Sequence, residues 1–269
     1  MNTIKKSFAV LGHPISHSLS PRIHQHFANQ FGIKINYQAI DVDINDFSKK
    51  LSDLKDRNYE GLNITLPLKT LAYKSCDYLS LKSQKTKSVN TISILNNKIY
   101  GDTTDGIGLV NDLLKRGVGI ENKKILMIGA GGASNGVIYD LISQHPHSIF
   151  LTNRTIIKSH QMKDDWMEFA SEKKVAINIY NSEESFSFDL IINATSSSLS
   201  ANNVVLPNNL NGQFWYDMMY GKQTTFLSMA EKNKAKFCDG LGMLVEQAAA
   251  AFYIWHKVKP DTKPIYQIL

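Results

Sequence analysis

A short apolar stretch that runs directly into a glycine-rich loop constrains this chain more than any other feature. Residues 125–128 are all apolar and are followed by the run Gly129-Ala130-Gly131-Gly132-Ala133 and then by a helical pattern. Glycines between a strand and a helix let the backbone approach a pyrophosphate, which unpaired amides at the helix N-terminus bind. The segment predicts a dinucleotide-binding site. A glycine-rich turn without a ligand is the alternative.

The end of the next predicted strand indicates which nucleotide is bound. NAD-specific sites usually place an acidic residue there, about 20 residues after the glycines, to bind the ribose 2′-hydroxyl. This chain instead has Asn153-Arg154-Thr155, followed by Lys158. Two cations and a hydroxyl suit a 2′-phosphate, which a carboxylate would repel. We therefore predict NADP as the cofactor, with a solvated basic helix start as the alternative.

Apolar segments alternate with amphipathic ones along the whole chain, which predicts an α/β fold. In the second half, strands are expected at residues 124–128, 148–152, 175–180, 189–193, 214–217 and 235–237, as in a six-stranded doubly wound sheet. In the first half, strands are expected at residues 7–11, 36–42 and 61–66, and Asn96-Asn97 joins a hairpin of residues 89–95 and 98–100.

Two helices are expected between the first strands. One has Ser20 as its N-cap, with Ile23, Phe27 and Phe31 on its apolar face, and the other begins near Asp43. The apolar face of the second helix comprises Ile44, Phe47, Leu51 and Leu54. We predict an N-terminal α/β substrate domain (residues 1–105, joined by the C-terminal segment 242–269) and a Rossmann-type NADP domain (residues 106–241).

Composition excludes several classes of protein. The 30 Lys and Arg against 24 Asp and Glu give a formal charge of +6, but they are scattered, which fits an anionic small molecule better than nucleic acid. No apolar tract reaches the ~18 residues of a membrane span. The two cysteines, Cys76 and Cys238, lie far apart, which favours a reducing cytoplasm. The histidines lack the partners of a metal site, so no metal is expected.

Polar residues gather in short segments of the first half of the chain. Ser16, Ser18 and Ser20 precede a helix start, and Asn63, Thr65 and Lys69 follow a predicted strand. Open α/β sheets bind ligands at the carboxyl ends of their strands. With the amide of Asn90 and the carboxylate of Asp105, these segments predict a pocket for a polyhydroxylated, anionic small molecule.

These segments also occur as an ordered series of motifs along the chain. The motifs are S-x-S-x-S-P (16–21), N-x-T-x-P-x-K (63–69), V-N-T (89–91), T-D-G (104–106), G-A-G-G-A (129–133), N-R-T with Lys158, N-A-T-S (193–196), Y-D-M-x-Y (216–220) and D-G-L-G-M-L-V-x-Q-A (239–248). In this order they resemble the shikimate dehydrogenase family over essentially the whole length. The resemblance implies an NADP-dependent enzyme of aromatic amino-acid biosynthesis that reversibly reduces 3-dehydroshikimate to shikimate.

The resemblance also implies roles for individual positions. Those implied to bind substrate are Ser16, Ser18, Thr65, Lys69, Asn90, Asp105, Tyr220 and Gln247. Those implied to bind NADP are Gly129, Ala130, Gly131, Gly132, Ala133, Asn153, Arg154, Thr155, Ile156, Ile157, Lys158, Met218 and Gly240. The chain departs from the family pattern at Thr103, Ser198 and Leu81.

The chemistry of such a reaction needs one group that moves a proton. As hydride is exchanged at the carbinol carbon, a proton leaves or joins its oxygen, so a proton carrier must lie within hydrogen-bond reach. Lys69 is the candidate, and Asp105 is expected to hold it in place. A quinate/shikimate dehydrogenase that uses both NAD and NADP, and a non-catalytic NADP-binding sensor, are the alternatives. The chain is expected to act as a monomer or homodimer.

Overall fold

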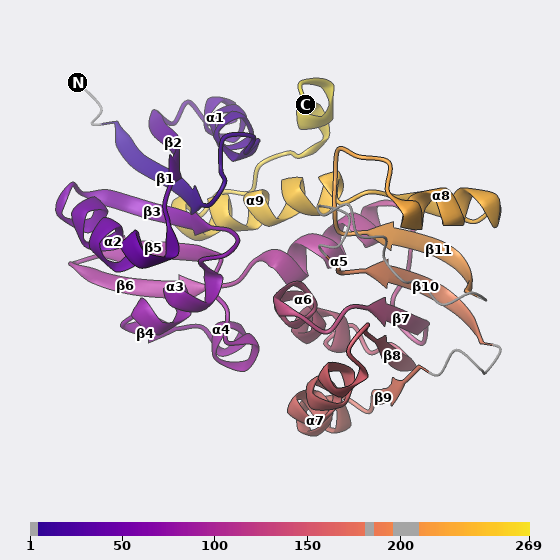
Figure 1. Ribbon diagram of the computed structural model, residues 1–269. Coiled ribbons are helices and arrows are strands. Elements are labelled where there is room, and N and C mark those ends of the chain that lie inside the picture. Colours follow the sequence, from indigo (N-terminus) through magenta and orange to yellow (C-terminus); the bar gives the residue numbers. More distant parts are fainter. Residues whose placement is uncertain (1–4, 181–185, 196–209) are drawn as a thin grey trace. The chain divides into compact units, whose positions relative to one another are not determined.

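Two sheets organise the part of the chain that the computed structural model describes, residues 5–180, 186–195 and 210–269 (Figure 1). Each sheet belongs to a separate unit. The first unit comprises Met1–Gly108 and Val245–Leu269, and the second comprises Leu109–Leu244. Both sheets alternate with helices along the chain, so the predicted α/β fold class is confirmed.

The sheet of the first unit is mixed and has the strand order β2-β1-β3-β5-β6-β4. Its strands are β1 (Lys6–Gly12), β2 (Ile35–Asp41), β3 (Tyr59–Ile64), β4 (Tyr78–Leu79), β5 (Thr91–Leu95) and β6 (Lys98–Asp102). Strands β2, β1 and β3 are parallel, whereas β5 runs antiparallel to β3 and β6. The predicted hairpin is confirmed, and Asn96 and Asn97 turn it with φ values of 51° and 61°.

Helices of the first unit follow the predicted faces with three corrections. They are α1 (Ser20–Gln30), α2 (Phe47–Asp56), α3 (Lys69–Ser75) and α4 (Leu81–Thr86). The Ser20 N-cap was wrong, because α1 begins at Ser20 and the hydroxyl of Ser18 accepts its amide at 3.3 Å. Phe31 follows the last turn and is exposed, although its ring stacks on Phe252. Ile44 is exposed because Asp43 caps a separate 3₁₀ turn (Ile44–Asp46) before α2.

The last helix, α9 (Leu241–His256), packs on the first sheet through the aromatic residues of its C-terminal half. The indole of Trp255 donates to the carbonyl of Ile92 at 3.0 Å, and its ring lies 4.9 Å from that of Phe8. A Cβ on Gly61 would meet the Trp255 ring at 2.4 Å, so this strand position has room only for glycine. A short 3₁₀ turn (Lys263–Gln267) follows the helix.

The sheet of the second unit is parallel throughout, with the strand order β12-β11-β10-β7-β8-β9. Its strands are β7 (Lys124–Ile128), β8 (Ser148–Thr152), β9 (Ala176–Ile179), β10 (Ser187–Asn193), β11 (Asn211–Asp217) and β12 (Lys236–Cys238). The first strand lies in the middle and the order reverses beside it, as in a doubly wound dinucleotide-binding sheet.

Helices connect the strands of the second unit. They are α5 (Asp105–Lys115), which leads in from the first unit, α6 (Gly132–Ile142), α7 (Ile156–Glu172) and α8 (Thr225–Lys232). The central strand is apolar along its length and its residues 125–128 are buried, because helices flank a parallel sheet on both faces. Within the described residues, no helix is both long and apolar enough to span a bilayer.

Candidate active site

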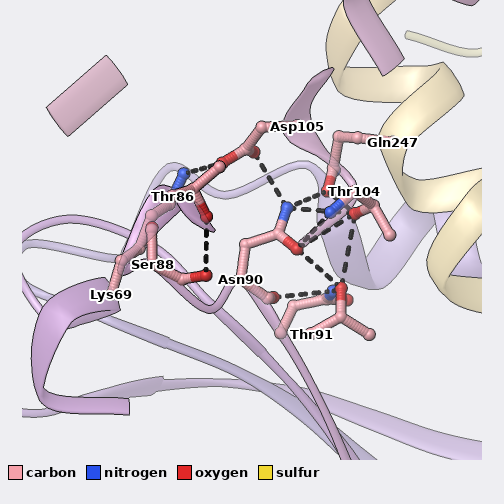
Figure 2. Close-up of polar contacts among 9 residues, drawn as sticks. Lys69, Thr86, Ser88, Asn90, Thr91, Thr104, Asp105 and Gln247 are labelled. Atoms are coloured by element: carbon pink, nitrogen blue, oxygen red, sulfur yellow. Dashed lines mark hydrogen bonds and ion pairs between the residues drawn. The ribbon is translucent and has the colours of Figure 1, made fainter. Parts of the chain in front are cut away.

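A lysine and a carboxylate meet at the carboxyl ends of the strands of the first unit. Lys69 Nζ donates to Asp105 Oδ2 at 2.6 Å, although 36 residues separate them (Figure 2). Lys69 is the first residue of α3 and Asp105 the first of α5. Their side chains are 23% and 12% exposed, so the pair is mostly shielded from solvent. An ion pair in such surroundings is stronger than one on the surface.

The amide of Asn90 holds the other oxygen of the carboxylate. Its Nδ2 donates to Asp105 Oδ1 at 2.8 Å and to Thr104 Oγ1 at 3.0 Å. Gln247 reaches the same group from α9, where its Oε1 lies 3.3 Å from Asn90 Nδ2 (Figure 2). Four predicted substrate-binding residues thus form one hydrogen-bonded cluster, comprising Lys69, Asn90, Asp105 and Gln247.

Backbone hydrogen bonds bring two further polar segments together beside the ends of β1 and β3. The amide of Thr65 donates to the carbonyl of Leu11 at 2.9 Å, and that of His13 donates to the carbonyl of Leu66 at 3.1 Å. A Cβ on Gly12 would lie 2.3 Å from the Thr65 methyl group, so glycine allows this close approach. The loop that follows carries the exposed Ser16 and the partly exposed Ser18.

Tyr220 is the one predicted substrate-binding residue that lies in the second unit. It follows β11 in sequence and its side chain is half-buried. Burial raises the pKa of its hydroxyl above the ordinary value. The hydroxyl is therefore a neutral hydrogen-bonding group at physiological pH.

The glycine-rich loop of the second unit lies between β7 and α6, as predicted. Gly129 has a φ of 110°, and a Cβ there would lie 3.1 to 3.2 Å from Ala194 and Thr195. Nothing lies within 4 Å of a Cβ built on Gly131 or Gly132, so the loop presents bare backbone to open space. Gly131 precedes the first turn of α6 without a side-chain cap, which leaves N-terminal amides available to an anion.

The second predicted cofactor segment is tied to this loop by Asn153. Its Oδ1 accepts the amide of Ala130 at 3.3 Å, and its Nδ2 donates to the carbonyl of Thr155 at 3.0 Å. Arg154 and Lys158 are exposed, and their side chains form no hydrogen bond or ion pair with the described part of the chain. The exposed Ile156 and Ile157 offer an apolar surface beside these cations. The segment thus fits a phosphorylated ribose with an adjacent flat, apolar group.

Met218 and Gly240 are far apart in sequence and adjacent in the structure. The Met218 amide donates to the carbonyl of Asn193 at 2.9 Å, at the end of β10. A Cβ on Gly240 would lie 2.3 Å from the Met218 carbonyl oxygen. The backbone segments that carry these two predicted cofactor-binding positions therefore cross in close contact, and we call this contact the Met218–Gly240 crossing. Met219 is held there by Asp217, whose pKa is raised by burial.

The three departures from the family pattern have separate outcomes. Thr103 is fully buried, and its hydroxyl has no hydrogen-bond partner among the described residues. Leu81 is exposed at the start of α4. Ser198 lies outside the residues that the structure describes, as does Ser196 at the end of the N-A-T-S motif. Over the described ranges, no three His, Cys, Asp or Glu side chains converge as metal ligands.

Two threonines in the cluster were not predicted to be part of it. Thr104 donates its amide to Asn90 Oδ1 at 2.8 Å, and the hydroxyl of Thr91 donates to the same oxygen at 2.8 Å. Both are buried. Thr91 directly follows Asn90 in V-N-T, and Thr104 directly precedes Asp105 in T-D-G. This adjacency to predicted site residues is the sequence signal that could have identified them. Their hydrogen bonds depend on how β5 and β6 pair.

Three family models match the chain. They describe a "shikimate dehydrogenase substrate binding domain" at residues 10–92, a "shikimate / quinate 5-dehydrogenase" at residues 112–210 and a "shikimate 5'-dehydrogenase C-terminal domain" at residues 240–269. The first region contains Lys69 and Asn90, and the second contains the glycine-rich loop. Together the three models cover most of the chain.

Relatives and solved structures match over nearly the full length. A relative from Vesicomyosocius okutanii subsp. Calyptogena okutanii, named shikimate dehydrogenase (NADP(+)), is 42% identical over 96% of this chain and 97% of its own. An Ael1 enzyme from Pseudomonas putida has a TM-score of 0.91 at 33% identity, with 98% of each chain covered. Shikimate 5-dehydrogenase from Thermus thermophilus, solved with NADP(H) and shikimate, has a TM-score of 0.87 at 28% identity, with 97% of each covered.

Proposed function

The chain belongs to the shikimate dehydrogenase family, and we propose that Lys69 and Asp105 are the residues that move and position the proton of its reaction. The protein is an NADP-dependent oxidoreductase that reversibly reduces 3-dehydroshikimate to shikimate in aromatic amino-acid biosynthesis. Neither the dual-cofactor quinate enzyme nor the non-catalytic sensor is favoured by its relatives.

The 2.6 Å contact between Lys69 and Asp105 is the observation that supports this assignment. When bound, NADPH supplies the hydride for the substrate carbonyl carbon, and NADP+ accepts it in the reverse direction. In reduction, the Lys69 ammonium donates a proton to the carbonyl oxygen, which becomes the hydroxyl of shikimate. In oxidation, the neutral amine takes the proton from that hydroxyl. Asp105 orients the amine, and Asn90 orients Asp105.

The remaining polar residues supply the contacts that a polyhydroxylated acid requires. We propose that Ser16, Ser18 and Thr65 bind its hydroxyl and carboxylate oxygens, together with Asn90, Gln247 and Tyr220. The exposed or partly exposed hydroxyls of the first three support this, because they lie on segments joined at the ends of β1 and β3. Hydroxyls both donate and accept hydrogen bonds, so they suit a ring that carries several hydroxyl groups and a carboxylate.

The second unit carries the residues proposed to hold NADP. The bare backbone of Gly131 and Gly132 at the start of α6 fits a pyrophosphate. The cations Arg154 and Lys158, whose side chains have no partner among the described residues, fit a 2′-phosphate. The side chain of Asn153 joins the glycine-rich loop to the segment after β8, so its role is to align the two phosphate subsites. Met218 and Gly240 are proposed to complete the site through their backbone.

We propose a cytoplasmic location, supported by Cys76 and Cys238, which are both free thiols. A monomer or homodimer is proposed as the active form. Sedimentation equilibrium distinguishes the two, and a higher oligomer at assay concentration contradicts both.

Replacement of Lys69 by alanine tests the proposed proton transfer. We expect kcat for shikimate oxidation to fall by at least ~10²-fold with a modest change in KM, because a general acid–base group acts in the transition state. Lys98→Ala is the matched control, since Lys98 forms an exposed ion pair with Asp77 at 2.9 Å in the same unit. Unchanged kcat in Lys69→Ala, measured as NADPH formation, removes Lys69 from the mechanism.

A further inference from the structure

The orientation of the Asn90 amide is fixed by groups whose hydrogen-bonding roles are unambiguous. The backbone N–H of Thr104 can only donate, and it faces Asn90 Oδ1 at 2.8 Å. The carboxylate of Asp105 accepts, and it faces Asn90 Nδ2 at 2.8 Å. The oxygen end of the amide therefore points away from Asp105, and the nitrogen end points toward it.

Thr91 holds the oxygen end of this amide from the opposite side. Its hydroxyl carries a single proton, which it donates to Asn90 Oδ1 at 2.8 Å (Figure 2). The side chain is 1% exposed and lies on the first residue of β5. Thr91 thus reaches Asp105 through Asn90, and its hydroxyl oxygen also lies 3.3 Å from that of Thr104.

The donor chain extends further into the first unit behind Thr91. Asn63 Nδ2 donates to Thr91 Oγ1 at 3.3 Å across the paired strands β3 and β5, and the Tyr37 hydroxyl donates to Asn63 Oδ1 at 2.7 Å. All three side chains are buried. From Tyr37 to Asn90, each group donates toward the Asp105 carboxylate. Hydrogen bonds that run in one direction polarise and strengthen one another.

We propose that Thr91 is a positioning residue for the reaction, which keeps the Asn90 amide turned so that Asp105 faces Lys69. This inference rests on the proposed roles of Lys69 and Asp105. Its physical basis is preorganisation, since a donor that is already aligned need not reorient as the proton moves. Thr104 also holds Asn90 Oδ1, so loss of Thr91 loosens the amide without releasing it.

Thr91→Val tests the proposal, because valine keeps the β-branched shape and removes only the hydroxyl. We expect kcat to fall roughly 5- to 20-fold while KM for shikimate changes by less than about 2-fold, as for the loss of one hydrogen bond that matters in the transition state. Thr91→Ser retains the donor and is expected to keep kcat within about 2-fold of the unmodified enzyme. If Thr91 had only a structural role, kcat and the unfolding temperature would fall together in Thr91→Val and recover together in Thr91→Ser.

Thr86→Val is the matched control in the same unit. The Thr86 hydroxyl is also buried, but it donates to the backbone carbonyl of Lys82 at 2.9 Å. The kcat of Thr86→Val is expected to equal that of the unmodified enzyme. In an Asn90→Ala background, Thr91→Val is expected to have no further effect on kcat, because Thr91 acts through Asn90.

Two results overturn the proposal: unchanged kcat in Thr91→Val, or equal loss in Thr91→Ser and Thr91→Val. If Lys69→Ala is inactive, either result overturns only the role of Thr91 and leaves the proposed function intact. If Lys69→Ala retains full kcat instead, the proposed roles of Lys69 and Asp105 fail first. The three variants therefore separate the two failures.

Discussion

At the scale of single residues, we propose that Arg154 decides which nucleotide the second unit prefers. Arg154 is exposed and follows Asn153, which binds the glycine-rich loop, and the described residues provide no carboxylate partner for its guanidinium. A 2′-phosphate would therefore gain a charge-assisted hydrogen bond that the hydroxyl of NAD cannot form. Lys158 adds a second positive charge one helical turn later.

Replacement of Arg154 by alanine is expected to raise KM for NADP roughly 10- to 100-fold, with kcat little changed, because the contact is the same in ground and transition states. KM for NAD should stay the same. Arg57→Ala is the control, since Arg57 is an exposed arginine paired with Asp53 in the other unit. An unaltered ratio of the two KM values in Arg154→Ala would contradict the proposed phosphate contact.

At the scale of elements, the approach of α9 to the end of β11 depends on a glycine. Gly240 lies directly before α9, and a Cβ there would lie 2.3 Å from the carbonyl oxygen of Met218 and 2.7 Å from its carbon. Both atoms are backbone, which cannot move aside as a flexible side chain can. Asp239 also binds this crossing, because its carboxylate accepts the amides of Gly221 and Leu241.

We expect Gly240→Ala to lower the free energy of unfolding by roughly 1–3 kcal/mol, as overpacking typically does. It should also raise KM for NADP, because Met218 must shift. Gly119→Ala is the control, since nothing lies within 4 Å of its Cβ position, and its unfolding free energy should change by less than about 0.5 kcal/mol. Urea titration of both variants measures the difference. Equal midpoints would show that the crossing tolerates a methyl group.

Element boundaries also show where sequence patterns were sufficient. Strands β7 and β8 occupy the predicted residues, because each contains a short, mostly buried apolar run, residues 125–128 and 149–151. The 3₁₀ turn before α2 was missed, since Asp43 and Ile44 fit a helical pattern equally well. The short helices α3 and α4 and the two-residue strand β4 were not predicted, because segments of this length carry too little periodicity.

At the scale of the whole molecule, a buried histidine makes stability depend on pH. His24 is 1% exposed and stacks on Tyr37 with ring centroids 4.4 Å apart. Burial, and secondarily the nearby His256, lowers the pKa of His24 from 6.5 to about 3. Between these values the unfolded chain binds a proton that the folded chain does not. The free energy of unfolding is therefore unaffected by protonation of His24 above pH 6.5 and declines as the pH falls from 6.5 toward 3.

His24→Phe is expected to flatten the acid dependence of unfolding. One such histidine contributes a slope of about 1.4 kcal/mol per pH unit, which the variant should lose. Phenylalanine keeps a ring to stack on Tyr37, and neither imidazole nitrogen of His24 has a hydrogen-bond partner among the described residues. His160→Gln, on the exposed face of α7, is the control. Equal slopes in His24→Phe and the unmodified protein would mean that other groups govern acid unfolding.

The sequence by itself determined the α/β class, the positions of the long strands, the glycine-rich loop and, through ordered motifs, the family. These properties are local or periodic, so neighbouring residues suffice to specify them. Only the tertiary structure decided which distant side chains form hydrogen bonds with one another and which amide atom faces which oxygen. Lys69 meets Asp105 across 36 residues, and Asn90 meets Gln247 across 157. Hydrogen bonds are short and directional, so contacts of this kind depend on how strands pair and how helices pack.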